Sequence, residues 1–192
     1  SYPVAQLPLF GNIPIEEACD SKNDPTLLPF AFFGSVHPEW NIGDAIAVVK
    51  KLAQSSGRQP LIRSIGLGGQ HASRTWNQFR RAGVKVEEVG PLSPAAVSTT
   101  LATCDAALSA YPPDLIEKSG SAVSLFEHGL PVIITRPPIW GEQYLERVRE
   151  NCPLAYWGKQ LTDMKVLPQK LPRKSSLTEV AETFIRTLGE AC

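Results

Sequence analysis

Residues 118–121, KSGS, form the stretch of this sequence whose residue types best suit the binding of an anion. A serine can cap the first backbone N–H groups of a helix, and the GLP at 129–131 is typical of a helix end. Unpaired N–H groups and the helix dipole favour negative charge at a helix N-terminus. This loop therefore predicts an anion site in which Lys118 adds a positive charge. The alternative is an ordinary serine-capped loop with a solvated lysine.

Other motifs for phosphate or acyl chemistry are incomplete. Residues 66–70, GLGGQ, resemble a dinucleotide-binding fingerprint, but the last glycine of G-x-G-x-x-G would fall at His71. The P-loop pattern and the G-x-S-x-G of serine hydrolases are both absent. Asp114 and Glu117 flank the anion loop, yet a paired-carboxylate mechanism cannot be argued from spacing alone. The sequence thus disfavours a nicotinamide site and a serine nucleophile.

Several single residues allow two interpretations. His37 is either a ligand contact or a polar group satisfied within its loop. Trp40 and Trp140 lie in loops where an indole ring stacks on a base or packs against a neighbouring loop. His128 falls at a helix end, where the favoured interpretation is structural because a cation suits the helix dipole.

Hydrophobic patterning places these loops in an alternating α/β chain. Short apolar runs predict five strands, each followed by a segment with helical spacing, and such alternation is typical of a Rossmann-like parallel sheet with helices on both faces. Ligands of such sheets bind beyond the carboxyl ends of the strands. The loops expected there hold much of the glycine, two of the three histidines and Lys118, which favours the anion site. The predicted strands are 29–34, 61–66, 84–89, 105–109 and 132–135.

Composition narrows the function classes. The 192 residues suit one domain, here residues 29–170, after a proline-rich linker at 1–28 and before a C-terminal helix at 171–192. The net charge of zero does not favour nucleic acid as a partner. Four widely spaced cysteines predict reduced thiols, a cytoplasmic location and no zinc site. No apolar run is long enough to span a membrane, although association with a membrane surface stays open.

The order of these loops resembles the carboxyl-terminal half of a GT-B glycosyltransferase, in particular the retaining enzymes of family 4. The resemblance covers residues 30–134 and is most specific in 89–109, VGPLSPAAVSTTLATCDAALS, and in the GLPVI at 129–133. It implies one half of a GT-B fold and the transfer of a sugar from a nucleotide diphosphate sugar to an acceptor hydroxyl, with retention. It also implies that the donor is bound without a metal or other cofactor, and that an amino-terminal acceptor-binding domain is the partner. The alternative is a non-catalytic nucleotide-binding or scaffolding domain that has lost the donor chemistry.

The resemblance also implies the roles of individual residues. Backbone N–H groups of the anion loop would bind the diphosphate, Lys118 would neutralise its charge, and residues 89–92 would border the base. Two positions depart from the family pattern. The two glutamates of the family would align with Ile116 and Ser124, and the nearest acidic residues are Glu117 and Glu127. The family also has an arginine after the first strand, and this sequence has Ser35 at that position. Lys118 or Arg63 could compensate for the missing arginine. The candidate catalytic residues are Lys118 and Glu117, and the candidate nucleotide-sugar contacts are Gly34, Ser35, His37, Leu92, Ser119, Gly120, Ser121 and Ser124.

Overall fold

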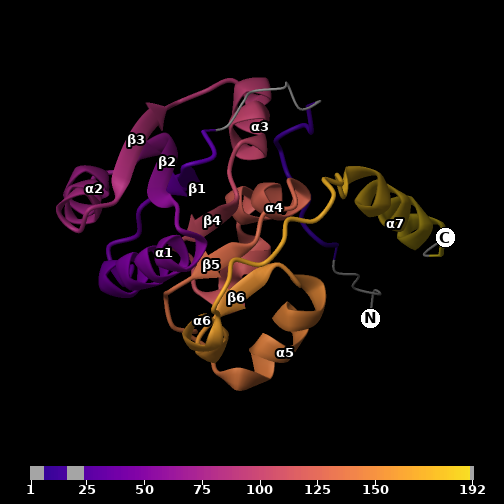
Figure 1. Ribbon diagram of the computed structural model, residues 1–192. Helices are drawn as coiled ribbons and strands as arrows, with labels where there is room; N and C mark the ends of the chain where they lie inside the picture. Colours follow the sequence, from indigo (N-terminus) through magenta and orange to yellow (C-terminus); the bar gives the residue numbers. More distant parts are fainter. Residues whose placement is uncertain (1–6, 17–23, 191–192) are drawn as a thin grey trace.

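The computed structural model describes residues 7–16 and 24–190, and within them six parallel strands form one sheet (Figure 1). The strand order is β3-β2-β1-β4-β5-β6, and every neighbouring pair is parallel. The predicted Rossmann-like α/β fold is thereby confirmed. The strands are β1 (Leu27–Ser35), β2 (Gln59–Gly68), β3 (Lys85–Gly90), β4 (Ala106–Ser109), β5 (Val132–Ile134) and β6 (Ala155–Trp157).

Helices cover both faces of the sheet because alternate strand residues point in opposite directions. Phe30 and Phe32 of β1 belong to a core shared with α1, α2 and α6, whereas Ala31 belongs to a core shared with α3, α4 and α5. The helices are α1 (Ile42–Ser56), α2 (Ala72–Arg81), α3 (Pro94–Ala102), the 3-10 helix η1 (Pro113–Lys118), α4 (Gly120–Glu127), α5 (Glu142–Asn151), α6 (Lys159–Asp163) and α7 (Leu177–Glu190).

The stretch around the anion loop folds as its residue types indicate. Ser119 is the N-cap of α4, and its hydroxyl accepts from Ala122 N at 3.3 Å. Gly129 has φ +72°, in the left-handed region expected just past a helix, and Leu130 after it is fully buried. The helix, turn and strand predicted there are confirmed.

Three short elements differ from the sequence prediction. Residues 155–157 form a sixth strand rather than an isolated apolar segment, because β5 offers them a parallel partner. Residues 113–118 form the 3-10 helix η1 and residues 159–163 form α6, and the sequence predicted neither helix. Trp40 lies in the core, where its ring is stacked on that of Phe32 at a centroid distance of 5.1 Å. Of the two interpretations of Trp40, the structure therefore supports packing within the protein.

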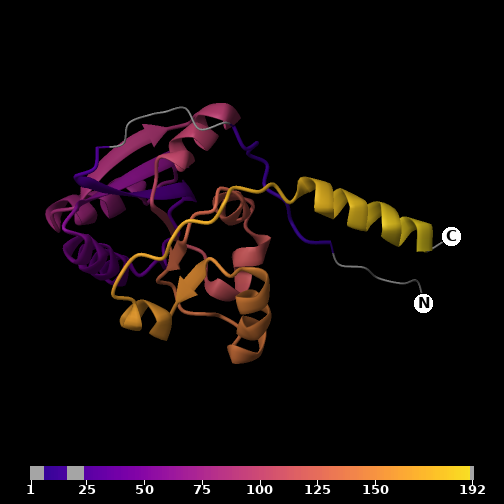
Figure 2. The same ribbon diagram turned by 45° about the vertical axis from the view of Figure 1, so that its right-hand side comes forward.

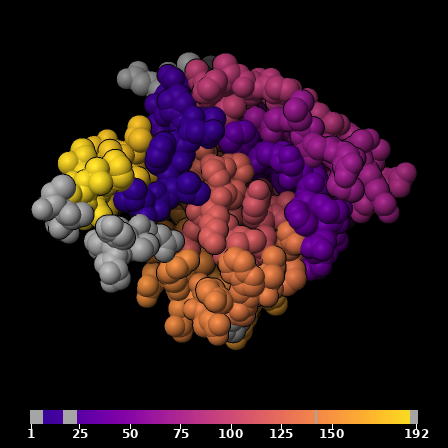
Figure 3. All heavy atoms as spheres, turned by 180° about the vertical axis from the view of Figure 1, so that it is seen from behind, coloured from indigo at the N-terminus to yellow at the C-terminus, as the bar shows by residue number. Residues whose placement is uncertain are grey.

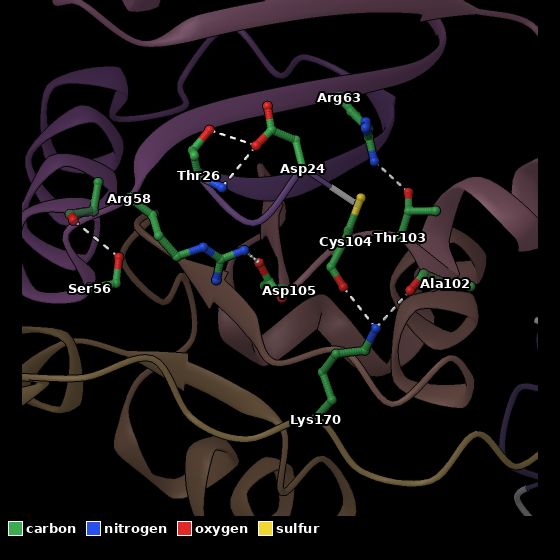
Figure 4. Close-up of polar contacts among 11 residues, drawn as sticks. Asp24, Thr26, Ser56, Arg58, Arg63, Ala102, Thr103, Cys104, Asp105 and Lys170 are labelled. Atoms are coloured by element: carbon green, nitrogen blue, oxygen red, sulfur yellow. Dashed lines mark hydrogen bonds and ion pairs between the residues drawn. The ribbon is translucent and has the colours of Figure 1, made fainter. Parts of the chain in front are cut away.

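The segment between α6 and α7 runs along the amino-end side of the sheet (Figures 1 and 2). There Lys170 Nζ donates to the carbonyls of Ala102 at 3.0 Å and Cys104 at 2.8 Å, beside an ion pair of 2.6 Å between Arg58 and Asp105 (Figure 4). Beyond this segment α7 projects away from the sheet. None of the described helices is long and apolar enough to cross a membrane.

Candidate functional site

The first turn of α4 lies at the carboxyl-end edge of the sheet, where its backbone N–H groups have no partners within the helix. Ser119 and Ser121 flank Gly120, and their hydroxyl oxygens lie 3.0 Å apart. Ser119 is buried, Ser121 half-buried and Gly120 exposed. This turn therefore presents small side chains and backbone donors, as an anion requires.

The end of β1 lies against this turn, and glycines at the end of β2 lie against the end of β1. A Cβ atom added at Gly34 would lie 3.4 Å from Ser121 Oγ, and one at Gly66 would lie 3.9 Å from both N and O of Gly34. One at Gly69 would lie 3.6 Å from Ser35 Cβ. We call these five residues, Gly34, Ser35, Gly66, Gly69 and Ser121, the glycine cradle. Its surface is mostly backbone, which lets a ligand approach closely.

All three glycines of the cradle have a positive φ, and Gly34 is the one that lies against α4. Its φ of +118° is rarely adopted by residues with a side chain. The pairing of β1 with β2 shifts register between Phe33 and Ser35, so the strand bends at this point. The irregularity turns the end of β1 towards α4 and brings Gly34 and Ser35 beside Ser121.

Lys118 and Glu117 precede the α4 N-cap, but their side chains contact the α5 side of the chain. Lys118 Nζ lies 5.1 Å from the ring centroid of Trp140 and is exposed. The carboxylate of Glu117 accepts from Arg147 Nη2 at 3.1 Å and from Asn151 Nδ2 at 2.7 Å. These contacts of both side chains lie outside the glycine cradle, and the catalytic roles of both residues remain predictions.

The other candidate contacts are distributed around the same region. His37 is exposed in the loop after β1, where its Nδ1 accepts from Glu39 N at 3.2 Å. Leu92 is half-buried against the core of α3 and α4. Ser124 is fully buried and donates to the carbonyl of Gly120 at 2.9 Å, so it supports the first turn from within α4. The structure thus brings Gly34, Ser35 and the serines of the first turn together, and places His37, Leu92 and Ser124 outside that group.

A buried carboxylate that the sequence did not distinguish ties two loops of this edge together. Asp114, in η1, is 4% exposed, and its Oδ2 accepts from Ile139 N at 2.8 Å and Trp140 N at 2.6 Å. Within the described part of the chain, its Oδ1 is buried without a hydrogen-bond partner. Asp114 therefore holds the loop after β5 so that Trp140 contacts Lys118. The sequence shows that Asp114 lies close to the anion loop. It does not show the backbone partners of Asp114, because they belong to a loop that is distant in sequence.

A buried histidine fixes the opposite end of α4. His128 Nδ1 lies 2.7 Å from Ser124 O and can only donate to it, while Nε2 lies 2.9 Å from Ser98 Oγ. Burial lowers the pKa of His128, as do the nearby charges of Arg173 and Lys170, against the opposing effects of the Ser124 carbonyl and Glu127. The structural interpretation of His128 is confirmed, but burial favours the neutral ring over the cation considered from sequence.

Across residues 7–16 and 24–190, no group of three or more histidine, cysteine, aspartate or glutamate residues is placed to hold a metal ion.

Comparison with known proteins gives structural similarity alone. No protein-family model matches the sequence, and no curated protein matches it. The fold is similar to part of the crystal structure of TarM, with 13% identity, a TM-score of 0.40, and coverage of 66% of this chain and 24% of that one. It is similar to WaaG, a glycosyltransferase involved in lipopolysaccharide biosynthesis, with 19% identity, a TM-score of 0.42, and coverage of 91% and 39%. It is also similar to the GtfA/B complex, with 15% identity, a TM-score of 0.45, and coverage of 96% and 39%. The chain spans less than half of the length of each of these structures.

Proposed function

We propose that this chain is the donor-binding domain of a glycosyltransferase, which holds a nucleotide diphosphate sugar while the sugar is transferred, with retention, to an acceptor hydroxyl. The observation that carries the proposal is the glycine cradle at the first turn of α4. The ends of β1 and β2 and the first turn of α4, which follows β4, converge there, at the edge of a parallel sheet where ligands usually bind. The sequence resemblance to GT-B enzymes points to the same edge.

The cradle suits a diphosphate for electrostatic reasons. Backbone N–H groups of Gly120 and Ser121 would donate to phosphate oxygens, while that of Ala122 is capped by the Ser119 hydroxyl, and the α4 dipole would favour the negative charge of the phosphates. Negative charge grows on the leaving diphosphate as the glycosidic bond breaks, so donors that are already oriented lower the barrier. Lys118 would rotate from Trp140 to add a full positive charge. Residues 29–170 would hold the donor without a divalent ion.

The experiment is a calorimetric titration with UDP, GDP and ADP of the wild type and of Ser121→Asp. Aspartate at the second position of a helix favours helix stability, yet it would place a carboxylate inside the cradle. We expect one of the three nucleotides to bind, EDTA to leave its affinity unchanged, and Ser121→Asp to abolish its binding. Ser73→Asp is the matched control, because Ser73 is the exposed second residue of α2. Unchanged binding by Ser121→Asp would exclude the cradle as the diphosphate site.

An alternative function is a nucleotide-binding domain without catalysis. It is favoured by the engagement of Glu117 with α5 and by the full burial of Ile116 and Ser124, the positions that match the family glutamates. Transfer assays with labelled nucleotide sugars distinguish the two proposals. Nucleotide binding without turnover, in a protein that also contains an acceptor-binding domain, would favour the alternative.

The amino-terminal acceptor-binding domain is proposed to dock on the surface of α7. Its apolar residues Leu177, Phe184, Ile185 and Leu188 are between 48% and 68% exposed, whereas Val180 is buried. An apolar helix face of this kind is costly to leave in water and is typical of a contact surface. The cytoplasmic location also remains a prediction, with which the free thiols of Cys104 and Cys152 are compatible.

A further inference from the structure

A cavity of about 630 Å³ lies on the α1 and α6 side of the sheet. It is bordered by the loop after β5, by the first turn of α1 and by the start of α6, so it opens near the same carboxyl-end edge as the cradle but between different elements. Its volume is in the range of small-molecule sites. Its lining includes Asn41, Lys51, Arg136, Pro137, Trp157 and Leu161.

Arg136 is a residue of this cavity whose buried guanidinium has more hydrogen-bond donors than its contacts within the protein use. Its side chain is 9% exposed, and its Nη2 forms an ion pair with Glu39. A guanidinium carries five N–H donors, and Glu39 is the one acceptor that Arg136 has among the described residues. A buried charge is stable only when it is well paired and its donors are satisfied. Arg136 therefore retains donors for a further acceptor at the cavity surface.

The partner of Arg136 is itself weakly held. The side chain of Glu39 is 72% exposed, in the loop between β1 and α1. An exposed carboxylate is readily solvated and gains little from a surface ion pair. Glu39 itself therefore loses little when it moves into water, but the buried Arg136 must stay paired, so the ligand that replaces Glu39 must also carry an acidic group.

The other polar groups of the cavity are already engaged. Thr135 Oγ1 accepts from Trp40 Nε1 at 3.0 Å and donates to Asn41 O at 3.2 Å, which fixes that wall. Lys51 Nζ donates to Thr162 O at 2.7 Å but still adds positive charge. Asp44 is the opposing carboxylate, and it is exposed and accepts from Asn41 Nδ2 at 2.6 Å. The remaining lining is largely apolar, from Val48, Ile134, Pro137, Pro138 and Leu161.

We propose that this cavity is a second binding site, which takes a small organic anion. The carboxylate or phosphate of the ligand replaces Glu39 on Arg136, and its apolar or ring-shaped body packs against the two prolines and Leu161. Arg is suited to this role because its planar donors match both carboxylate and phosphate oxygens. The site is separate from the proposed diphosphate site, because the residues of the cradle do not line it.

The probes for the test are phenyl phosphate, benzoate and uncharged benzamide, each titrated into the protein by calorimetry. We expect one of the two acids to bind and benzamide to bind at least about tenfold more weakly, because a charged hydrogen bond is worth about that factor. Glu39→Gln should tighten binding of the acid about tenfold by removing its competitor. Glu88→Gln is the control and should leave binding of the acid unchanged, because Glu88 is likewise an exposed carboxylate paired with an arginine but lies on β3.

Arg136→Gln should abolish binding of the acid, and Arg136→Lys should weaken it. If Arg136→Gln does not fold, the comparison of Glu39→Gln with Glu88→Gln decides. Ser121→Asp, which blocks the cradle, should leave binding of the acid unchanged and so separates this site from the diphosphate site. Binding of neither acid to wild type and Glu39→Gln would overturn the proposal, as would equal binding by Arg136→Gln or loss of binding in Ser121→Asp.

Discussion

Glu127 is a buried residue whose side chain binds both ends of the described chain to the sheet domain. Its Oε1 accepts from Gly11 N at 3.1 Å, from Ser176 N at 2.9 Å and from the Ser176 hydroxyl, and its side chain is 5% exposed. The segment 7–16 and the start of α7 therefore both contact the end of α4, and they lie side by side in Figure 3. Replacing Glu127 by alanine should loosen both segments at once.

The expected size of the effect follows from these three hydrogen bonds. A hydrogen bond to a charged group contributes about 1.5–3 kcal/mol, and a buried donor left without a partner costs a similar amount. The full sum is not expected, because a groove of about 670 Å³ borders Glu127 and Ser176 and lets water reach the freed donors. We expect Glu127→Ala to lower the free energy of unfolding by about 3 kcal/mol, which for a chain of this size lowers Tm by about 6–12 °C.

Urea unfolding and limited trypsin digestion measure this effect. Arg173 and Lys174 precede α7, and both are tied down, since Arg173 Nη1 donates to Glu16 O at 2.8 Å and Lys174 N donates to Glu127 O at 2.9 Å. In Glu127→Ala, cleavage there should become faster because the segment opens more often. Glu127→Gln keeps an acceptor oxygen and should lose about 1 kcal/mol.

Glu179→Ala is the matched control for this test. Its carboxylate lies 3.6 Å from Lys174 Nζ, and both side chains are more than two-thirds exposed, so its removal should change stability by less than about 0.5 kcal/mol. A Glu127→Ala protein as stable and as protease-resistant as the control would refute the assignment of Glu127 as the attachment point.

Three further predictions concern charge and thiol chemistry. Lys118→Ala should weaken UDP binding by about 1–3 kcal/mol and uridine binding hardly at all, because a lysine acts on the phosphate charge; equal calorimetric losses would place Lys118 elsewhere. Because burial lowers the pKa of His128, the unfolded chain binds the proton more readily, and the free energy of unfolding should fall as the pH drops below about 6.5. Urea unfolding at neutral and acidic pH should show a smaller fall for His128→Gln, and an identical fall would contradict the role of this ring. Burial raises the pKa of Cys104 to about 11 and that of Cys152 to about 12. In a variant with Cys19→Ser and Cys192→Ser, a thiol reagent should therefore react with these two cysteines only after unfolding. Rapid labelling of the native variant would contradict this prediction.

Elements stabilised by local interactions could be predicted from the sequence. The cap at Ser119 and the left-handed Gly129 each depend on residues within one turn, and so do the cap at Ser93 and the proline after it that start α3. Local residue types therefore determined where α3 begins and where α4 begins and ends. The alternation of these elements was then sufficient to give the parallel sheet.

Elements stabilised by distant partners could not be predicted. The three residues of β6 show no period of their own and form a strand because β5 pairs with them. Asp114 binds amides 25 and 26 residues away, and Arg136 pairs with Glu39 across 97 residues. Spacing along the chain carries no signal for such contacts, so two of the charged groups that shape the candidate sites became visible only in the fold.

The position of α4 links the candidate site to the attachment of the chain ends. Its first turn forms one wall of the glycine cradle, and its last residue, Glu127, holds both segment 7–16 and the start of α7. An eight-residue helix is about 12 Å long and moves as one unit. Ser124 and His128 bind successive turns of it through backbone carbonyls, and Ser98 fixes the histidine to α3. A domain that docks on the exposed face of α7 would therefore be attached through the same helix whose first turn faces the proposed donor.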